Sequence, residues 1–168
     1  MGIEAYNKGL KPFTPPLILL LMERIEKTIL ISAPSEKVFS LIEKFEEIPN
    51  FSSAISEVVS ESEKISLWKI EIGGINVEWR AELVEKKAPS RLSWRSISGI
   101  HNRGGYELEP IDGKTKVTFF MEYRLPSRVL ERALHIPMDR MIEEIYSEIL
   151  TNIQNELEVE VGKSDPGN

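Results

Sequence analysis

The longest regular pattern of hydrophobic and polar positions lies over residues 127–161 of the 168-residue chain. Apolar side chains recur there every three or four residues, which is the spacing of one face of an α-helix. Pro137 interrupts the helix because proline has no amide hydrogen and its ring clashes with the preceding turn. We therefore predict a short helix over residues 127–135 and a long helix over residues 137–160. The apolar positions are Leu130, Leu134, Met138, Met141, Ile142, Ile145, Ile149, Ile153 and Leu157.

The preceding hundred residues show a different pattern, in which apolar and polar positions alternate as in strands with one buried face. Tight turns are predicted at Gly73-Gly74 and Asp112-Gly113, and a bend is predicted at His101-Asn102, which lie among glycines. These signals divide the region into about seven strands. The predicted strands cover residues 23–33, 55–63, 65–72, 75–87, 92–98, 106–109 and 115–124.

Two short helices are predicted between the first two strands. Pro34 ends the first strand, and Ser35 is placed to cap a helix that carries Val38 and Phe39 on its apolar face. A second helical piece is expected to end at the Pro49-Asn50-Phe51 break. The sequence thus predicts the order strand, two small helices, six further strands and a long C-terminal helix.

A long amphipathic helix is marginally stable alone in water, so its apolar face must lie on a broad apolar surface. The strands offer such a surface, and we predict one α+β domain over residues 22–161, in which an antiparallel sheet wraps the long helix. We expect residues 1–21, which are rich in Gly and Pro, to form an irregular arm and residues 162–168 to form a tail. The apolar run at residues 17–22 is too short to cross a bilayer, which takes about 20 residues. We interpret this run as part of an arm packed on the domain or an upstream tail, with a membrane-surface anchor as the alternative.

Composition narrows the classes of partner. The chain has 41% hydrophobic and 29% charged residues, enough to bury one core, and a formal net charge of −6. An acidic balance without a Lys/Arg-rich run argues against nucleic acid as a partner. The chain has no cysteine, which removes thiolate metal ligands and thiol nucleophiles and fits a reducing compartment, so we expect a cytoplasmic protein.

Three stretches carry a resemblance to a known family: "ISAPSEKVFSLIEKFEEIPNF" from Ile31, "LSWRSISGIHNRGGYELEP" from Leu92 and "GKTKVTFFMEYRLP" from Gly113. Together with the order of elements, they resemble the polyketide cyclase/dehydrase branch of the START-like superfamily, which includes coenzyme Q-binding proteins. The resemblance covers residues 22–160. It implies the helix-grip fold and an apolar cavity between the sheet and the long helix.

Alternation places large side chains on the inward strand faces, opposite the helix stripe. Aromatic and flexible Met side chains suit an adaptable apolar pocket, although the same residues could fill a solid core. Ser96 and Asn102 are candidate polar groups for orienting a ligand. The candidate ligand-binding residues are Trp68, Trp79, Ala81, Trp94, Ser96, Asn102, Tyr106, Phe119, Met121, Tyr123, Met138, Met141, Ile142 and Ile145.

Signals for catalysis and metal binding are weak. His101 has no Asp or Ser at a recognisable spacing, and His135 adjoins the predicted helix break. Without a ligand cluster the sequence predicts no metal site, no cofactor and no catalytic residue. Glu78, Arg80 and Glu82 alternate with the inward residues and are expected to form a solvated charge ladder on the outward face.

Three functions remain open from the sequence. The first is binding of a small hydrophobic molecule such as a lipid, an isoprenoid or a polycyclic compound, with only transient membrane contact. The second is an enzyme resembling a polyketide cyclase, in which positioning of a reactive chain provides most of the effect. The third is an interaction module that docks on a protein or the ribosome, as some members of the superfamily do.

Overall fold

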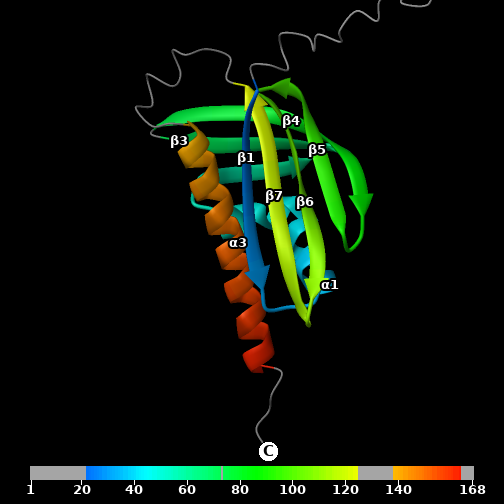
Figure 1. Ribbon diagram of the computed structural model, residues 1–168. Helices are drawn as coiled ribbons and strands as arrows, with labels where there is room; N and C mark the ends of the chain where they lie inside the picture. The colour runs from blue at the N-terminus through cyan, green and yellow to red at the C-terminus, as the bar shows by residue number, and fades with distance from the viewer. Residues whose placement is uncertain (1–21, 73, 125–137, 164–168) are drawn as a thin grey trace, which may run out of the picture.

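The computed structural model describes residues 22–72, 74–124 and 138–163, which form a curved antiparallel sheet and three helices (Figure 1). The strand order is β1-β7-β6-β5-β4-β3-β2, and the helices follow β1 or end the described chain. The predicted helix-grip α+β fold is confirmed. The elements are β1 (Glu23–Ile31), α1 (Ser35–Ile42), the 3-10 helix η2 (Phe45–Phe51), β2 (Ile55–Ser60), β3 (Ile65–Ile72), β4 (Ile75–Lys87), β5 (Arg91–Gly99), β6 (His101–Ile111), β7 (Lys114–Arg124) and α3 (Met138–Lys163).

The sheet bends strongly, so that β3 and β4 run across the direction of β1 and β7 in Figure 1. Register shifts interrupt the pairing of β4 with β5 between Arg80 and Ala81 and between Leu83 and Glu85, and a third interrupts the pairing of β2 with β3. An extra residue in one strand of an antiparallel pair increases the local twist and bends that strand. These irregularities contribute to the concave face that receives α3.

Helix α3 buries the predicted apolar stripe from Met138 to Leu157, and also Tyr146 and Leu150, which the stripe did not include. The helix continues to Lys163, three residues past the predicted end at residue 160. The short helix predicted over residues 127–135, the N-terminal arm and most of the C-terminal tail lie outside the described residues. None of the described helices has an apolar stretch long enough to cross a membrane.

Helices also accompany the two edge strands of the sheet. Strand β1 pairs only with β7 and contacts α3, whereas β2 pairs only with β3 and contacts η2. In Figure 1, α3 runs obliquely to β1 and comes close to it toward the C-terminal end of the strand. The order of elements therefore places one helical segment beside each edge.

The region of His101 and Asn102 differs from the prediction, because it is part of β6 and not a bend. His101 pairs with Arg124, and Asn102 pairs with Tyr123. Gly104 and Gly105 also lie within the strand, where a Cβ would be 2.9 Å from the Trp94 ring and 2.9 Å from the Phe120 ring, respectively. These glycines leave room for aromatic rings on neighbouring strands. In the sequence, glycines with this packing role cannot be distinguished from glycines that form turns.

Ser35 also differs from its predicted role as a helix cap. Pro34 occupies the N-cap position, and the Ser35 hydroxyl lies 3.1 Å from Thr115 Oγ1 on β7. Thr115 Oγ1 in turn donates to the carbonyl oxygen of Ala33 at 2.7 Å, and both hydroxyl side chains are buried. The start of α1 is thus fixed by a hydrogen-bond chain to the sheet.

Two strands end earlier than predicted. Strand β1 ends at Ile31, two residues before the predicted end, and β2 ends at Ser60, three residues early. Helix η2 ends at Phe51, within the predicted break, and Pro49 lies inside the helix.

We predict that Thr115→Val lowers the free energy of unfolding by about 1–3 kcal/mol, because it leaves the buried Ala33 carbonyl and Ser35 hydroxyl without their partner. The matched control is Thr118→Val on the outer face of the same strand, where the hydroxyl meets only Thr28 at 3.3 Å. The control should change stability by less than about 0.5 kcal/mol. Urea unfolding of both variants measures the difference, and equal effects would contradict the anchoring role.

Candidate functional site

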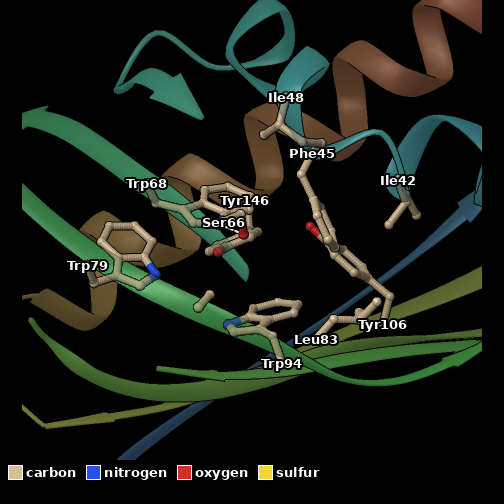
Figure 2. Close-up of a pocket in the computed structure, with 11 residues that line it drawn as sticks. Ile42, Phe45, Ile48, Ser66, Trp68, Trp79, Leu83, Trp94, Tyr106 and Tyr146 are labelled. Carbon is tan, nitrogen blue, oxygen red and sulfur yellow. Dashed lines mark hydrogen bonds between the residues drawn. The ribbon is translucent and has the colours of Figure 1, made fainter. Parts of the chain in front are cut away.

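Two small cavities lie side by side between the concave face of the sheet and the helices. The first, drawn in Figure 2, has a volume of about 20 Å³, and the second has about 40 Å³. Trp79 of β4 and Tyr146 of α3 line both, so these two side chains form the partition. The first cavity is also lined by Ile42, Phe45, Ile48, Ser66, Trp68, Ala81, Leu83, Trp94 and Tyr106, and the second by Ile55, Ile70, Ile100, Asn102, Met121, Tyr123, Met138, Met141, Ile142 and Ile145.

Aromatic rings make up much of the wall of the first cavity. Trp68 and Trp79 are cross-strand partners on β3 and β4, and their rings stack with centroids 5.9 Å apart. Trp94 lies 5.8 Å from Tyr106 between ring centroids, on the opposite side of the cavity. Phe45 from η2 adds a fifth ring, 5.8 Å from Trp68. Such rings provide large apolar contact surfaces for a ligand.

Tyr146 holds the helix to the sheet next to the cavities. Its ring stacks on Phe119 of β7 with centroids 3.6 Å apart, and Phe119 is fully buried. Phe119 also contacts Trp94 and Tyr106, at centroid distances of 6.2 and 5.4 Å. Phe119 therefore supports the cavity wall from behind and does not line either cavity.

Hydrogen bonds fix most of the polar groups near the cavities. Trp68 Nε1 donates to Ser66 Oγ at 2.9 Å, and Trp94 Nε1 donates to Asn102 Oδ1 at 3.1 Å. The backbone N–H of Asn102 donates to Ser96 Oγ at 2.9 Å, and its side-chain amide donates to the Ile100 carbonyl. Ser96 thus positions Asn102, and Asn102 positions the Trp94 indole.

Two tyrosines keep their protons far above neutral pH. Burial raises the pKa of the Tyr106 hydroxyl well above its ordinary value, with a smaller contribution from Tyr146. Burial likewise raises the pKa of Tyr146. Both hydroxyls are therefore uncharged hydrogen-bond donors under ordinary conditions.

The structure brings most of the predicted ligand-binding residues to these cavities. Twelve of the fourteen line one or both cavities. The two exceptions are Phe119, which packs against the wall residues Trp94 and Tyr106, and Ser96, which positions Asn102. Tyr146 was missed because it was not assigned to the apolar stripe, although it lies one turn after Ile142. Ile42, Phe45 and Ile48 were missed too, and their three-residue spacing in the short helices was the available signal.

Among the described residues, no Lys, Arg, His, Asp or Glu lines either cavity. His101 is exposed at the start of β6, and His135 lies outside the described residues. On the outer face, Arg80 pairs with Glu61 and Glu82 pairs with Arg95, as the predicted charge ladder requires. Within the described ranges no group of three His, Asp or Glu side chains could hold a metal ion.

Comparisons with known proteins agree with this architecture. A relative in Streptomyces lincolnensis, an uncharacterized 17.2 kDa protein, is 24% identical over 115 residues, which cover 66% of this chain and 75% of the relative. The crystal structure of TTHA0849 from Thermus thermophilus aligns with a TM-score of 0.68 at 21% identity, covering 79% of this chain and 95% of that protein. The Zhui aromatase/cyclase from Streptomyces sp. R1128 aligns with a TM-score of 0.68 at 14% identity, covering 88% of this chain and 99% of that protein.

These structural similarities show a shared fold, and the family follows from a sequence model. The model described as polyketide cyclase / dehydrase and lipid transport matches residues 22–158, which is most of the chain. The match confirms the resemblance found in the sequence. The chain therefore belongs to the polyketide cyclase/dehydrase and lipid transport family.

Proposed function

We propose that the protein binds a small, predominantly apolar molecule between the concave face of its sheet and α3. The observation that supports this most is the pair of apolar cavities, which share Trp79 and Tyr146 in their walls. The residues around them are large and apolar, with a few uncharged polar groups, as in many small-molecule sites. The description of the family includes lipid transport, which fits a carrier.

The present volumes define a closed form of the site. A void of about 20 or 40 Å³ holds one or a few water molecules, whereas drug-sized ligands occupy about 300 Å³ or more. Binding therefore requires the partition to move and the two cavities to merge. Met121, Met138 and Met141 line the second cavity, and their unbranched side chains can adopt other shapes at low cost.

A second function is favoured by the two protonated tyrosines. Tyr106 and Tyr146 line the first cavity, and their hydroxyls could donate hydrogen bonds to the carbonyl oxygens of a folded reactive chain. Neither cavity is lined by a His, Asp or Glu that could act as a base among the described residues. In this cyclase-like alternative, positioning of the chain supplies most of the rate enhancement. We place both functions in the cytoplasm, since a chain without cysteine fits a reducing compartment.

We predict that the neutral probe N-phenyl-1-naphthylamine binds with micromolar affinity, which corresponds to about −8 kcal/mol. Its fluorescence should rise in the apolar site, and the emission of Trp68, Trp79 and Trp94 should change because these residues line the cavities. A fluorescence titration measures both signals. If neither changes, ligand binding is wrong and the interaction-module hypothesis becomes the leading one.

The site of binding is tested by Ala81→Phe, since Ala81 is buried in the wall of the first cavity. The added ring exceeds the void of about 20 Å³, so we expect loss of probe binding and a decrease in unfolding free energy of about 1–3 kcal/mol. The matched control is Val84→Phe on the same strand, where the side chain is 59% exposed. The control should bind the probe like the wild type. Unchanged binding by Ala81→Phe would place the probe elsewhere.

The protonation of Tyr146 is tested by alkaline unfolding. Below about pH 10 the hydroxyl is protonated in both the folded and the unfolded chain, so the stability is unaffected by this group. Above pH 10 the unfolded chain loses the proton while burial retains it in the fold, so stability falls as pH rises. Tyr146→Phe removes this effect. The free energy of unfolding of this variant should therefore fall less steeply with pH than that of the wild type, by up to about 1.4 kcal/mol per pH unit. Urea midpoints at pH 8, 9.5 and 11 give the slopes, and parallel slopes would contradict the raised pKa.

The cyclase-like alternative predicts turnover of a poly-ketone chain that is lost in the double variant Tyr106→Phe/Tyr146→Phe. Product analysis by chromatography measures it, and undiminished turnover in the double variant would exclude these hydroxyls as the acids.

A further inference from the structure

The indole N–H of Trp79 is an unusual group in this site. Among the described residues, Trp79 Nε1 is the single buried side-chain nitrogen or oxygen without a hydrogen-bond partner. The side chain is 8% exposed. By contrast, Trp68 Nε1 donates to Ser66 and Trp94 Nε1 donates to Asn102. An indole N–H can only donate, and a buried donor without an acceptor is costly, so this position calls for an acceptor from outside the chain.

The orientation of the ring places this donor at the cavity. Figure 2 shows the nitrogen edge of Trp79 turned toward the interior of the first cavity, on the side of Ser66 and Tyr146. Trp79 also belongs to the partition between the two cavities. A ligand that merges the cavities therefore passes the indole N–H.

The linings of the two cavities disfavour an anionic ligand, because they offer no cationic side chain among the described residues. No Lys, Arg or His among the described residues lines either cavity, and both buried tyrosines are uncharged donors. A carboxylate would lose its hydration there without gaining a cationic partner.

A surface depression that shares Phe45 and Leu83 with the first cavity adds to this selection. It carries four carboxylates and two ammonium groups, and each ammonium group is paired with one of the carboxylates. An excess of negative charge beside the cavity disfavours the approach of an anion. The carboxylates are those of Glu43, Glu46, Glu47 and Glu63, and the ammonium groups are those of Lys44 and Lys86.

We propose that the ligand of this site is an uncharged, mostly apolar molecule with a carbonyl oxygen that accepts a hydrogen bond from Trp79 Nε1. The inference rests on the proposed function and narrows it to a class of ligand. Neutral ketones, aldehydes and esters belong to this class, and deprotonated carboxylic acids do not. In the unliganded protein the void has room for about one water molecule at this donor, and the ligand oxygen takes over that role.

Three naphthalenes of similar size test the inference by displacing N-phenyl-1-naphthylamine at pH 7. The carbonyl of 2-acetylnaphthalene can accept the hydrogen bond, 2-ethylnaphthalene has no acceptor, and 2-naphthoate carries a negative charge. We expect the acetyl compound to bind about five- to tenfold more tightly than the ethyl compound, because one hydrogen bond is gained. The naphthoate should bind at least about tenfold more weakly than the acetyl compound.

Two variants assign the preference to one indole. Trp79→Phe keeps an aromatic ring and removes the free N–H, so the ratio of acetyl to ethyl affinity should fall to about one. Trp68→Phe is the matched control, because the N–H that it removes is already bonded to Ser66. The control should keep the ratio of the wild type even if both affinities change.

Nuclear magnetic resonance of the wild type gives a readout that does not depend on a variant. The chain has three tryptophans, and the indole N–H signal of Trp79 should move downfield with 2-acetylnaphthalene and not with 2-ethylnaphthalene. Equal affinities of the two neutral compounds, a ratio preserved in Trp79→Phe, or tight binding of naphthoate would each overturn the inference while ligand binding itself stands. If none of the naphthalenes and no neutral probe binds, the proposed function fails and the inference fails with it.

Discussion

The stacking of Tyr146 on Phe119 is the contact on which the rest of the structure depends. It joins the N-terminal half of α3 to the middle of β7 at a centroid distance of 3.6 Å, and both rings are buried. Around it, the apolar stripe of α3 covers the concave face of the sheet. Each of these apolar surfaces would be exposed to water without the other. The same Tyr146 ring closes the space between the two cavities. The residue that stabilises the fold is therefore also the residue that limits the volume of the site.

A second constraint is the room that the strands leave for aromatic rings. Gly104 and Gly105 allow the rings of Trp94 and Phe120 to lie against β6, one on each side of the sheet. Trp94 is then held by Asn102, which is held by Ser96. Polar residues near the site thus act mainly by orienting indole rings, and only Trp79 among the three tryptophans keeps a free donor.

Much of the fold could be predicted from the sequence because its signals are local. The strands at Ile65–Ile72 and Ile75–Lys87 have the predicted ends, since alternation and glycine turns determine them. The predicted bend at His101-Asn102 was wrong, and these residues belong to β6. The reason is that glycines that make room for rings look the same in a sequence as glycines that form turns. Strand residues of the cavity walls such as Trp79 and Tyr106 could be predicted from alternation, whereas the short-helix residues and the partition by Tyr146 were missed. The position of one ring relative to another depends on tertiary packing, which periodicity does not contain.

The helices beside the edge strands affect how this protein meets other chains. An edge strand presents unpaired backbone N–H and C=O groups, and another strand can add to it. Here α3 contacts β1 and η2 contacts β2, so each edge of the seven-stranded sheet has a helical neighbour. An incoming strand must compete with these helices for space. The helical neighbours therefore oppose strand addition at both edges and the aggregation that follows from it.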